Sequence, residues 1–242
     1  MRETLSFLTY NGRRSLDYGL MVTGKTAFNG AQRDVTVVQV PGRDGDLIID
    51  NGRYKNVPIK YDLAIVPGMA PFGFAELAQI IKDWLLPGTG YYQLWDTYDP
   101  RYYRLGAYTG NVDIEQELTS LGSCSLSFDC KPFRYSVAGQ QAVTLTSAGT
   151  LYNGEAYASK PYIKVTGSGD ITLTINGTDY ELEDVDAYIE LDSELMNAYK
   201  GAINQNSKMT SVDFPKLVPG LNSISWTGTV TSVSIVPRWC CL

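Results

Sequence analysis

Histidine is absent from the 242 residues of this chain. Without an imidazole the sequence offers no Ser-His-Asp or Cys-His constellation and no His-ligated zinc. It also has no side chain whose unperturbed pKa lies near neutrality. Most hydrolases and metalloenzymes are thereby excluded. Glycoside hydrolysis by a pair of carboxylates stays open, because that chemistry needs only two acidic residues.

Positive charge is scarce. The chain has 20 Lys and Arg against 26 Asp and Glu, which gives a net charge of −6 and a pI near 4.7. Residues 1–134 carry 14 basic and 15 acidic residues, and residues 135–242 carry 6 and 11, so the acidity belongs to the C-terminal part. A protein that grips phosphate backbones has the opposite balance.

Long hydrophobic runs are also missing. No segment approaches the roughly 20 apolar residues that span a bilayer, and the first residues lack the apolar stretch of a signal peptide. We therefore expect a protein that folds in a cytosol. The four cysteines, Cys124, Cys130, Cys240 and Cys241, follow neither a metal-site spacing nor a disulfide framework, so we expect reduced thiols.

Short β-rich runs between Gly, Pro, Asn and Asp predict a mainly β protein. Helical spacing of apolar residues predicts one helix over Phe74–Leu85, stopped by Pro87-Gly88. The aromatic stretch from Tyr91 to Tyr103 predicts a hairpin that turns at Asp99-Pro100. An alternating strand follows, with Pro132 expected to close it, so a first domain is predicted over residues 1–135.

A second domain is predicted over residues 136–242, where Thr, Ser, Gly and Val are frequent. Two alternating runs flank Asn176-Gly177, a pair that suits the positive φ angles of a type I′ hairpin turn. The runs Leu221–Trp226 and Val230–Ile235 alternate in the same way. We expect this domain to be an antiparallel sandwich.

Three clusters could carry chemistry, and each has a plainer interpretation. The acidic segment from Glu181 to Glu194 lacks a calcium-loop register, so its acids are expected to face water. The stretch Pro41–Asp46 is not followed by a helix that could hold an anion, so we predict an exposed loop. The aromatic set is either a sugar-stacking platform or, as we favour, part of a core and a subunit interface. Its members are Tyr91, Tyr92, Trp95, Tyr98, Tyr102 and Tyr103.

Taken together, short motifs ordered along nearly the whole chain resemble those of the distal tail proteins (Dit) of bacteriophages with long non-contractile tails, usually of Gram-positive hosts. Each motif alone is weak, and their order over two domains makes the resemblance specific. The motifs are Pro41–Gly45, Asn51–Asn56, Ile81–Leu85, Leu94–Asp96, Asp99-Pro100, Tyr102-Tyr103, Phe128–Phe133, Asn153-Gly154, Lys160-Pro161, Gly167–Gly169, Asn176-Gly177, Phe214-Pro215 with Leu217, Pro219-Gly220 with Asn222, and Pro237–Trp239.

The resemblance implies an N-terminal domain related to tail-tube proteins, which is a β-sandwich or split barrel with one helix. It also implies a galectin-like C-terminal β-sandwich and a hexameric ring between the tail tube and the tail tip or baseplate. A galactose site of the galectin type uses His, Asn, Arg and Trp. The second domain has no His and a single Arg, Arg238, so a galectin-like shape need not bring galectin-like binding.

These observations predict a structural, non-enzymatic protein of the virion tail tip, assembled in the host cytoplasm. Its expected partners are five further copies of itself, the tail tube protein, a tail-tip protein and receptor-binding or baseplate proteins, with DNA passing through the ring unbound. No catalytic residue, cofactor, metal ligand or membrane contact is expected. Ring closure needs a heterologous contact, and Arg43, Asp44 and Asp46 are the candidate interface residues. The alternatives are a carbohydrate-binding module for host attachment and a two-carboxylate glycoside hydrolase.

Overall fold

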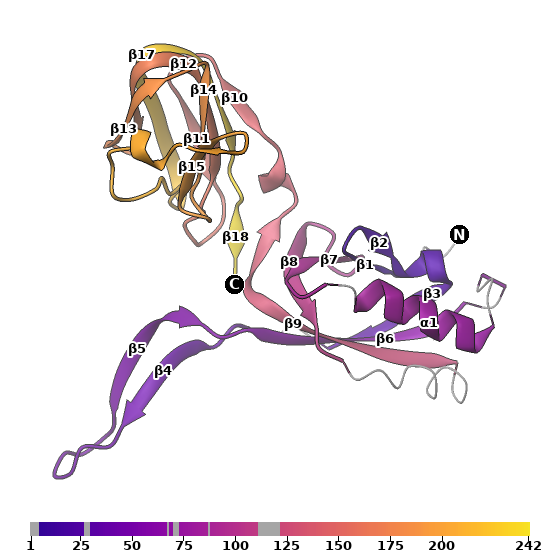
Figure 1. Ribbon diagram of the computed structural model, residues 1–242. Helices are drawn as coiled ribbons and strands as arrows, with labels where there is room; N and C mark the ends of the chain where they lie inside the picture. Colours follow the sequence, from indigo (N-terminus) through magenta and orange to yellow (C-terminus); the bar gives the residue numbers. More distant parts are fainter. Residues whose placement is uncertain (1–4, 27–29, 67, 70–72, 87, 111–121) are drawn as a thin grey trace. The chain divides into compact units, whose positions relative to one another are not determined.

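The computed structural model describes residues 5–26, 30–66, 68–69, 73–86, 88–110 and 122–242 (Figure 1). Internal contacts divide the chain into two compact units, residues 1–134 with Leu242 and residues 135–241. The chain is mainly β, and the described residues hold one α-helix, which confirms the predicted fold class. The predicted domain characters, tail-tube-like and galectin-like, stay predictions.

The first unit is built on a sheet whose strands follow the order β2-β1-β7-β8-β9-β6-β3. Strand β6 shows why these residues form it: apolar residues alternate with polar ones, and the apolar set is buried. The strands are β1 (Leu8–Tyr10), β2 (Arg13–Arg14), β3 (Leu20–Lys25), β6 (Val57–Ile65), β7 (Tyr92–Asp96), β8 (Tyr102–Tyr108) and β9 (Ser123–Ser136), with a 3-10 turn, η1, at Ser15–Tyr18.

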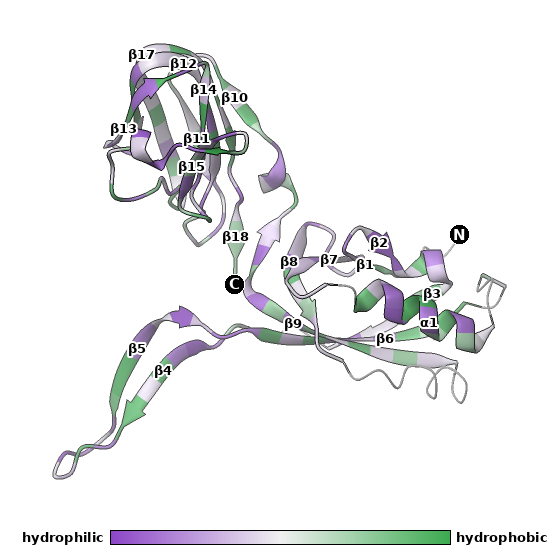
Figure 2. Ribbon diagram, in the orientation of Figure 1, coloured by the Kyte–Doolittle hydropathy of each residue, from purple (hydrophilic) through white to green (hydrophobic). Residues whose placement is uncertain are grey.

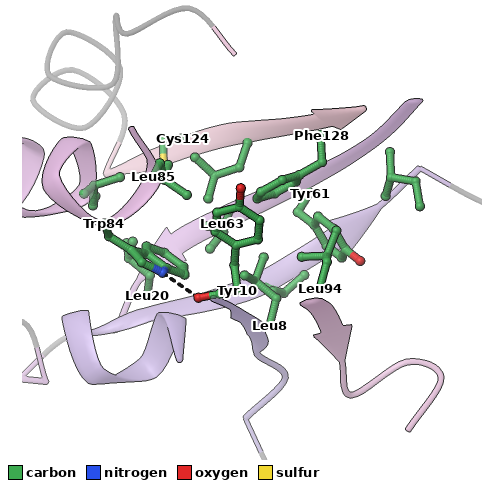
Figure 3. Packing of buried hydrophobic residues seen from close by; sticks show 14 of the residues in the cluster. Leu8, Tyr10, Leu20, Tyr61, Leu63, Trp84, Leu85, Leu94, Cys124 and Phe128 are labelled. Carbon is green, nitrogen blue, oxygen red and sulfur yellow. Dashed lines mark hydrogen bonds between the residues drawn. The ribbon is translucent and has the colours of Figure 1, made fainter. Parts of the chain in front are cut away.

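Helix α1 spans Phe74–Leu85, as its spacing predicts; Pro87, the expected stop, lies outside the described residues. The helix covers one face of the sheet and closes the core of the first unit (Figure 3). Trp84 is buried there, and its indole N–H donates to the Tyr10 carbonyl oxygen at 2.9 Å. The ring of Tyr10 packs in turn on Phe128 of β9, with centroids 4.9 Å apart.

Two strands of the first unit stand outside that sheet. β4 (Arg33–Val38) and β5 (Leu47–Tyr54) form a separate two-stranded hairpin, which leads directly into β6 (Figure 1). We call β4 and β5 the hairpin, and residues 39–46, which join them, the tip loop.

The second unit is a sandwich folded around two long strands, β12 and β17. The first half of β12 pairs with β14 and its second half with β13, while β17 runs along its other side. The strands are β10 (Val143–Leu145), β11 (Gly149–Asn153), β12 (Tyr162–Ile175), β13 (Thr178–Val185), β14 (Tyr188–Asp192), β15 (Asn197–Lys200), β16 (Ile203–Asn204), β17 (Gly220–Val236) and β18 (Cys240–Cys241), with 3-10 turns η2 at Ala138–Gln140 and η3 at Asn206–Lys208.

The predicted Asn176-Gly177 turn is confirmed, with φ angles of 54° and 79° between paired Ile175 and Thr178. The alternating runs 221–226 and 230–235 both belong to one strand, β17, in which Gly228 has a φ of 94° and a Cβ there would lie 2.4 Å from the Asp170 carbonyl oxygen. The prediction that Pro132 closes its strand is wrong, because β9 continues through this residue. The pairing of β9 with β6 ends at Cys130, so the missing N–H breaks no hydrogen bond to β6.

Candidate functional site

The hairpin exposes apolar side chains on both of its faces. Val37 pairs with Ile48, and the next pair, Val38 with Leu47, points to the opposite face. Ile48 is 67% exposed and Val37 is 55% exposed. Figure 2 shows hydrophobic residues on both strands. A two-stranded hairpin is marginally stable alone, and clustered apolar surface of this kind marks a contact with another protein.

Polar side chains join the two strands at the base of the hairpin. Arg33 bonds Asp50 across the strands at 2.5 Å and the Tyr54 hydroxyl at 3.0 Å. The hydrogen bonds from Arg33 lower the pKa of Asp50. The Tyr54 ring packs edge-on against Phe133 of β9, with centroids 5.9 Å apart. These contacts fix the register of the two strands and attach the base of the hairpin to the sheet, while the apolar residues further along the strands stay uncovered.

The tip loop carries the three candidate interface residues. Arg43, Asp44 and Asp46 all lie within four residues and are exposed, as the sequence predicts for this loop. Within the described residues, none of the three side chains has a hydrogen bond or ion pair. The structure therefore presents two unpaired carboxylates and one guanidinium at the end of the hairpin. Their role in an interface stays a prediction.

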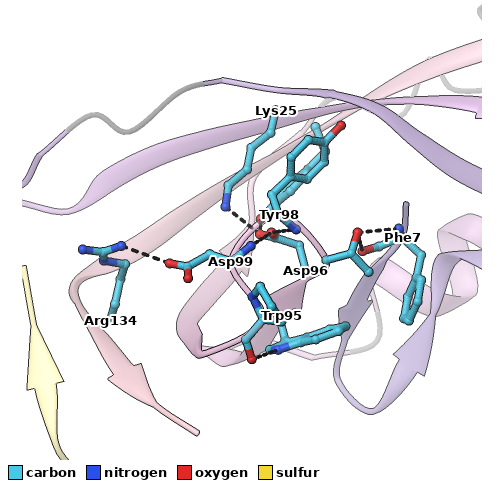
Figure 4. A network of polar contacts seen from close by, with 10 residues as sticks. Phe7, Lys25, Trp95, Asp96, Tyr98, Asp99 and Arg134 are labelled. Carbon is cyan, nitrogen blue, oxygen red and sulfur yellow. Dashed lines mark hydrogen bonds and ion pairs between the residues drawn. The ribbon is translucent and has the colours of Figure 1, made fainter. Parts of the chain in front are cut away.

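A polar network surrounds Asp96 at the end of β7 (Figure 4). Asp96 accepts hydrogen bonds from the Lys25 ammonium at 2.7 Å and the Tyr61 hydroxyl at 2.5 Å. Its second oxygen accepts the main-chain N–H groups of Tyr98 and Asp99, which fixes the turn between β7 and β8. Burial, and then the Asp96 carboxylate, raise the pKa of Tyr61 well above its usual value. The network joins β3, β6 and β7.

Beside this network lies a cavity of about 80 Å³ with a basic lining. Three cationic side chains reach it, and Asp99 is the acidic residue on the described wall. Arg134 pairs with Asp99 at 3.1 Å and also donates to the Leu242 main-chain oxygen at 3.0 Å. We call it the basic cavity and define it by Lys25, Pro58, Ile59, Asp99, Arg104 and Arg134.

One donor in the basic cavity has no acceptor. The Nε atom of Arg134 is buried and makes no hydrogen bond in the described part of the chain. A buried donor of this kind destabilises the protein unless a partner satisfies it. Arg104, which donates to the Pro132 carbonyl oxygen at 3.1 Å, places a second guanidinium beside it. Lys25 and Arg134 are already paired with Asp96 and Asp99, so the charges of the cavity are largely balanced within the chain.

Strands β6 and β9 turn one face to the core and present a polar surface on the other. On β9 the outward residues are Ser123, Ser125, Ser127 and then Asp129, alternating with buried apolar residues. On β6 they include Lys60 and Asp62, which lie 3.7 Å apart. This surface is rich in hydroxyl groups, and its charges of opposite sign are interspersed.

In the second unit the sequence prediction for the acidic segment is wrong at Asp192. Its side chain is only 6% exposed and forms two hydrogen bonds with Arg238, at 2.7 and 2.9 Å. Burial alone would raise the pKa of Asp192, but the Arg238 guanidinium and two main-chain N–H groups outweigh it, so the pKa lies below its usual value. The alternating pattern had suggested a solvated face. Asp192 is buried instead because its partner, Arg238, lies 46 residues further along the chain.

Aromatic rings on β12 and β14 face cations. Lys164 and Lys200 lie 4.1 and 5.5 Å from the centre of the Tyr188 ring, and Arg238 lies 5.9 Å from that of Tyr162. The Tyr162 hydroxyl donates to Glu190 at 2.5 Å. These are cation–π contacts within the chain, so the two rings are not open surfaces on which a sugar could stack.

The aromatic set around β7 and β8 is less buried than we predicted. Tyr92 packs against the core of the first unit, whereas Tyr91 and Tyr98 are exposed. The others lie half-buried at the surface. Their place as an interface is untested by the structure.

The four cysteines are free thiols, as predicted. Burial raises the pKa of Cys130 to about 12 and that of Cys240 to about 11, so neither is a reactive thiolate at neutral pH. Among the described residues, no cluster of Cys, Asp and Glu could hold a metal ion, and no helix is long and apolar enough to cross a bilayer.

Sequence reasoning missed the basic cavity. Its charged residues come from three strands, β3, β8 and β9, and from the turn after β7, so no local motif marks them. The available signal was indirect: Asp96 and Asp99 belong to two of the motifs that carry the resemblance.

Comparison with known proteins identifies the fold. No protein-family model matches the sequence, and no curated protein does. Among solved structures, the chain shares the fold of a phage tail hub protein. The particular structure is that of SPP1 Dit (gp 19.1), described as a paradigm of the hub adsorption apparatus in phages that infect Gram-positive bacteria. The TM-score is 0.69 at 14% sequence identity, over 96% of this chain and 98% of that one.

The expectation drawn from the motifs is thus confirmed for the fold. A second solved structure, the insecticidal crystal protein Cry2Aa, aligns at 12% identity over 93% of this chain and 52% of its own. The TM-score of that alignment is 0.23.

Proposed function

We propose that this chain is a structural protein of a phage tail, without catalytic activity. In this proposal six copies form a ring that joins the tail tube to the tail tip or baseplate. The observation that carries the proposal is the match in fold to a phage hub protein over nearly the full length of both chains. Fold alone does not define function, so features of this chain must support it as well.

The hairpin supports self-association. Its apolar faces are uncovered in a single copy, and its two strands are separate from the main sheet of the first unit. A contact between this hairpin and a different patch on the next copy would be heterologous, which is the type of contact that closes a ring. The exposed apolar residues of β4 and β5 suit such a contact.

The polar surface of β6 and β9 supports a channel for DNA. A channel wall that let DNA pass would avoid clustered Lys and Arg, because such clusters bind phosphates. Lys60 and Asp62 balance each other there, and serine hydroxyls make up most of the β9 contribution. We propose that this surface faces the lumen. A ring structure with a basic channel wall would contradict this assignment.

The remaining parts of the proposal concern partners and location. We propose that the ring contacts a tail tube protein on one side and tail-tip, receptor-binding or baseplate proteins on the other. It would be assembled in the cytoplasm of the bacterial host and found at the tail tip of the virion. Co-purification with the adjoining tail proteins would test each contact.

The decisive experiment measures the mass of the purified protein and images it. A hexamer has six times the 26.7 kDa of the chain, about 160 kDa. Mass photometry and negative-stain micrographs should show rings of that mass with a central hole. If only 26.7 kDa particles appear, even with tail tube and tail-tip proteins supplied, the proposal is wrong.

A carbohydrate-binding module has weaker support. Sugar sites present free aromatic faces beside polar groups, and the rings of Tyr162 and Tyr188 are instead next to Arg and Lys side chains. A glycan array with the full chain tests this alternative directly.

A further inference from the structure

Five Asn-Gly pairs occur in the chain, at positions 11, 29, 51, 153 and 176. Asparagine is a thermolabile residue, and it loses its side-chain amide most readily before glycine, whose main-chain nitrogen has no Cβ beside it. Asn29 lies outside the described residues. The other four pairs differ in how the structure holds the asparagine side chain and the glycine N–H.

Two of the four asparagines are held at both ends of the side chain. Asn153 is 1% exposed, its amide group donates to two carbonyl oxygens, and its side-chain oxygen accepts the Glu155 N–H at 3.0 Å. Asn176 donates to the Asn222 side-chain oxygen at 2.8 Å and accepts the Ser223 N–H at 3.0 Å. Neither side chain can turn toward the next residue without breaking these hydrogen bonds.

Asn51, in strand β5 of the hairpin, is exposed but also restrained. Its amide nitrogen lies 3.2 Å from the Thr36 hydroxyl oxygen, to which it donates. The Gly52 N–H donates to an Asp50 carboxylate oxygen at 2.9 Å, which engages the nitrogen that would have to attack. Reaction at this pair must first break hydrogen bonds to a hydroxyl and to a charged group.

Asn11-Gly12 has neither restraint. The pair forms the two-residue turn between β1 and β2, with φ angles of 49° and 75°, and both residues are exposed. The Asn11 main-chain N–H donates to the Gln93 carbonyl oxygen at 3.1 Å, but within the described residues neither the Asn11 side chain nor the Gly12 N–H has a hydrogen bond. Strand β2 is two residues long and pairs with β1 at the edge of the sheet, so the turn opens at small cost.

We propose that Asn11 is a site of spontaneous deamidation. The Gly12 nitrogen gives its proton to hydroxide and attacks the side-chain carbonyl carbon of Asn11. A C–N bond forms, the side-chain amide takes a proton from water and leaves as ammonia, and a succinimide ring results. Water then opens the ring at either of its carbonyl groups and leaves isoaspartate or aspartate. The net reaction consumes one water and releases one ammonia.

The products change both the charge and the backbone at this turn. Either product adds a carboxylate next to Arg13, an exposed side chain without an ion pair in the described part of the chain. Isoaspartate also adds one carbon to the main chain, which a two-residue type I′ turn does not accommodate, so β2 should detach from β1. Both residues of β2 are exposed, so the core of the first unit should stay intact. The inference does not rest on the proposed function.

Ageing the purified full chain at mildly alkaline pH tests the site. Peptide mapping by mass spectrometry should show that Asn11 loses its amide about tenfold or more faster than Asn51, Asn153 and Asn176. The peptide that contains position 11 should also become a substrate for methylation by an isoaspartyl methyltransferase. The control variant Asn11→Gln forms the corresponding ring far more slowly and should abolish this methylation. A rate at Asn11 no higher than at the three restrained asparagines would overturn the proposal.

A second variant tests whether hydrogen bonds set the difference. Thr36→Ala with Asp50→Ala removes the partners of Asn51 and of the Gly52 N–H from an exposed part of the hairpin, so the core should not be affected. Deamidation at Asn51 should rise about tenfold, toward the rate at Asn11. The rates at Asn153 and Asn176, in the second unit, should not change. An unchanged rate at Asn51 would show that free side chains and free N–H groups do not select the site, and the assignment to Asn11 would be wrong.

Discussion

The hairpin leaves apolar residues exposed, whereas the folded bodies, which are the rest of the two units, bury them. In β6 the residues Val57, Ile59, Tyr61 and Leu63 alternate with polar ones, and all four are buried by the chain itself. In the hairpin the run Leu47–Ile49 is apolar without alternation and stays exposed. The bodies complete their packing within one copy. The hairpin leaves its apolar faces uncovered in a single copy.

That difference separates stability from assembly. Substitutions in the bodies should lower the free energy of unfolding, and substitutions in the hairpin should leave it nearly unchanged while assembly fails. The expected changes in unfolding free energy fall from the core of the first unit to the hairpin.

The largest loss is expected for Phe128→Ala. The ring is 1% exposed and packs against Tyr10, Tyr61 and Tyr108, so its removal leaves a cavity in the core of the first unit. We expect a loss of about 3–5 kcal/mol in urea unfolding. Val212→Ala, at a 93% exposed position, is the control and should change stability by no more than about 0.5 kcal/mol. A loss below about 1 kcal/mol at Phe128 would contradict the buried position.

Arg238→Ala should come next. It leaves Asp192 buried with only main-chain donors, at a cost of about 2–3 kcal/mol at pH 7. The pKa of Asp192 is lowered in the folded protein, so its contribution is present above the unfolded pKa of about 3.9 and disappears as the pH falls below it. The difference between wild type and variant should shrink in acid. A difference that is constant from pH 7 to pH 3 would show that charge pairing is not its cause.

Gly177→Ala should cost about 1 kcal/mol. At φ 79° an alanine is strained, whereas nothing within 4 Å would block its Cβ, so the effect is one of backbone conformation alone. Thermal unfolding of the full chain measures it. Thr178→Ala, beside the turn, retains an ordinary backbone and serves as the comparison. Equal melting temperatures for Gly177→Ala and wild type would contradict the turn type.

The smallest change in stability is expected for Val37→Ser with Ile48→Ser in the hairpin. Both side chains are exposed, so unfolding should shift by no more than about 0.5 kcal/mol. Ring assembly, measured by mass photometry, should nevertheless be lost. Leu195→Ser with Ile203→Ser removes comparable exposed apolar surface from the second unit and should leave rings intact. Rings that survive the hairpin variant would remove the distinction between hairpin and bodies.

Much of the fold follows from local patterns. The apolar spacing over 74–85 predicts α1, and the Asn176-Gly177 pair predicts the turn with its positive φ angles. The pairing of β7 with β8 is predicted by β-propensity and by the turn at Asp99-Pro100, and Trp95 does pair with Tyr103. These features depend on neighbours within a few residues. The predictions at Pro132 and Asp192 are wrong because each depends on a strand or side chain far away in the sequence.

The amino-acid order by itself determined the chain's mainly β character, its acidity, its lack of imidazole chemistry and the exposed loop that holds Asp44 and Asp46. These properties need only composition, period and turn preference. Tertiary structure alone decided which apolar runs are covered and which cations converge. Lys25, Arg104 and Arg134 lie up to 109 residues apart, and only the pairing of distant strands brings them to one cavity. Alternation indicates which side of a strand a side chain faces. The packing of the whole chain decides whether other residues cover that side.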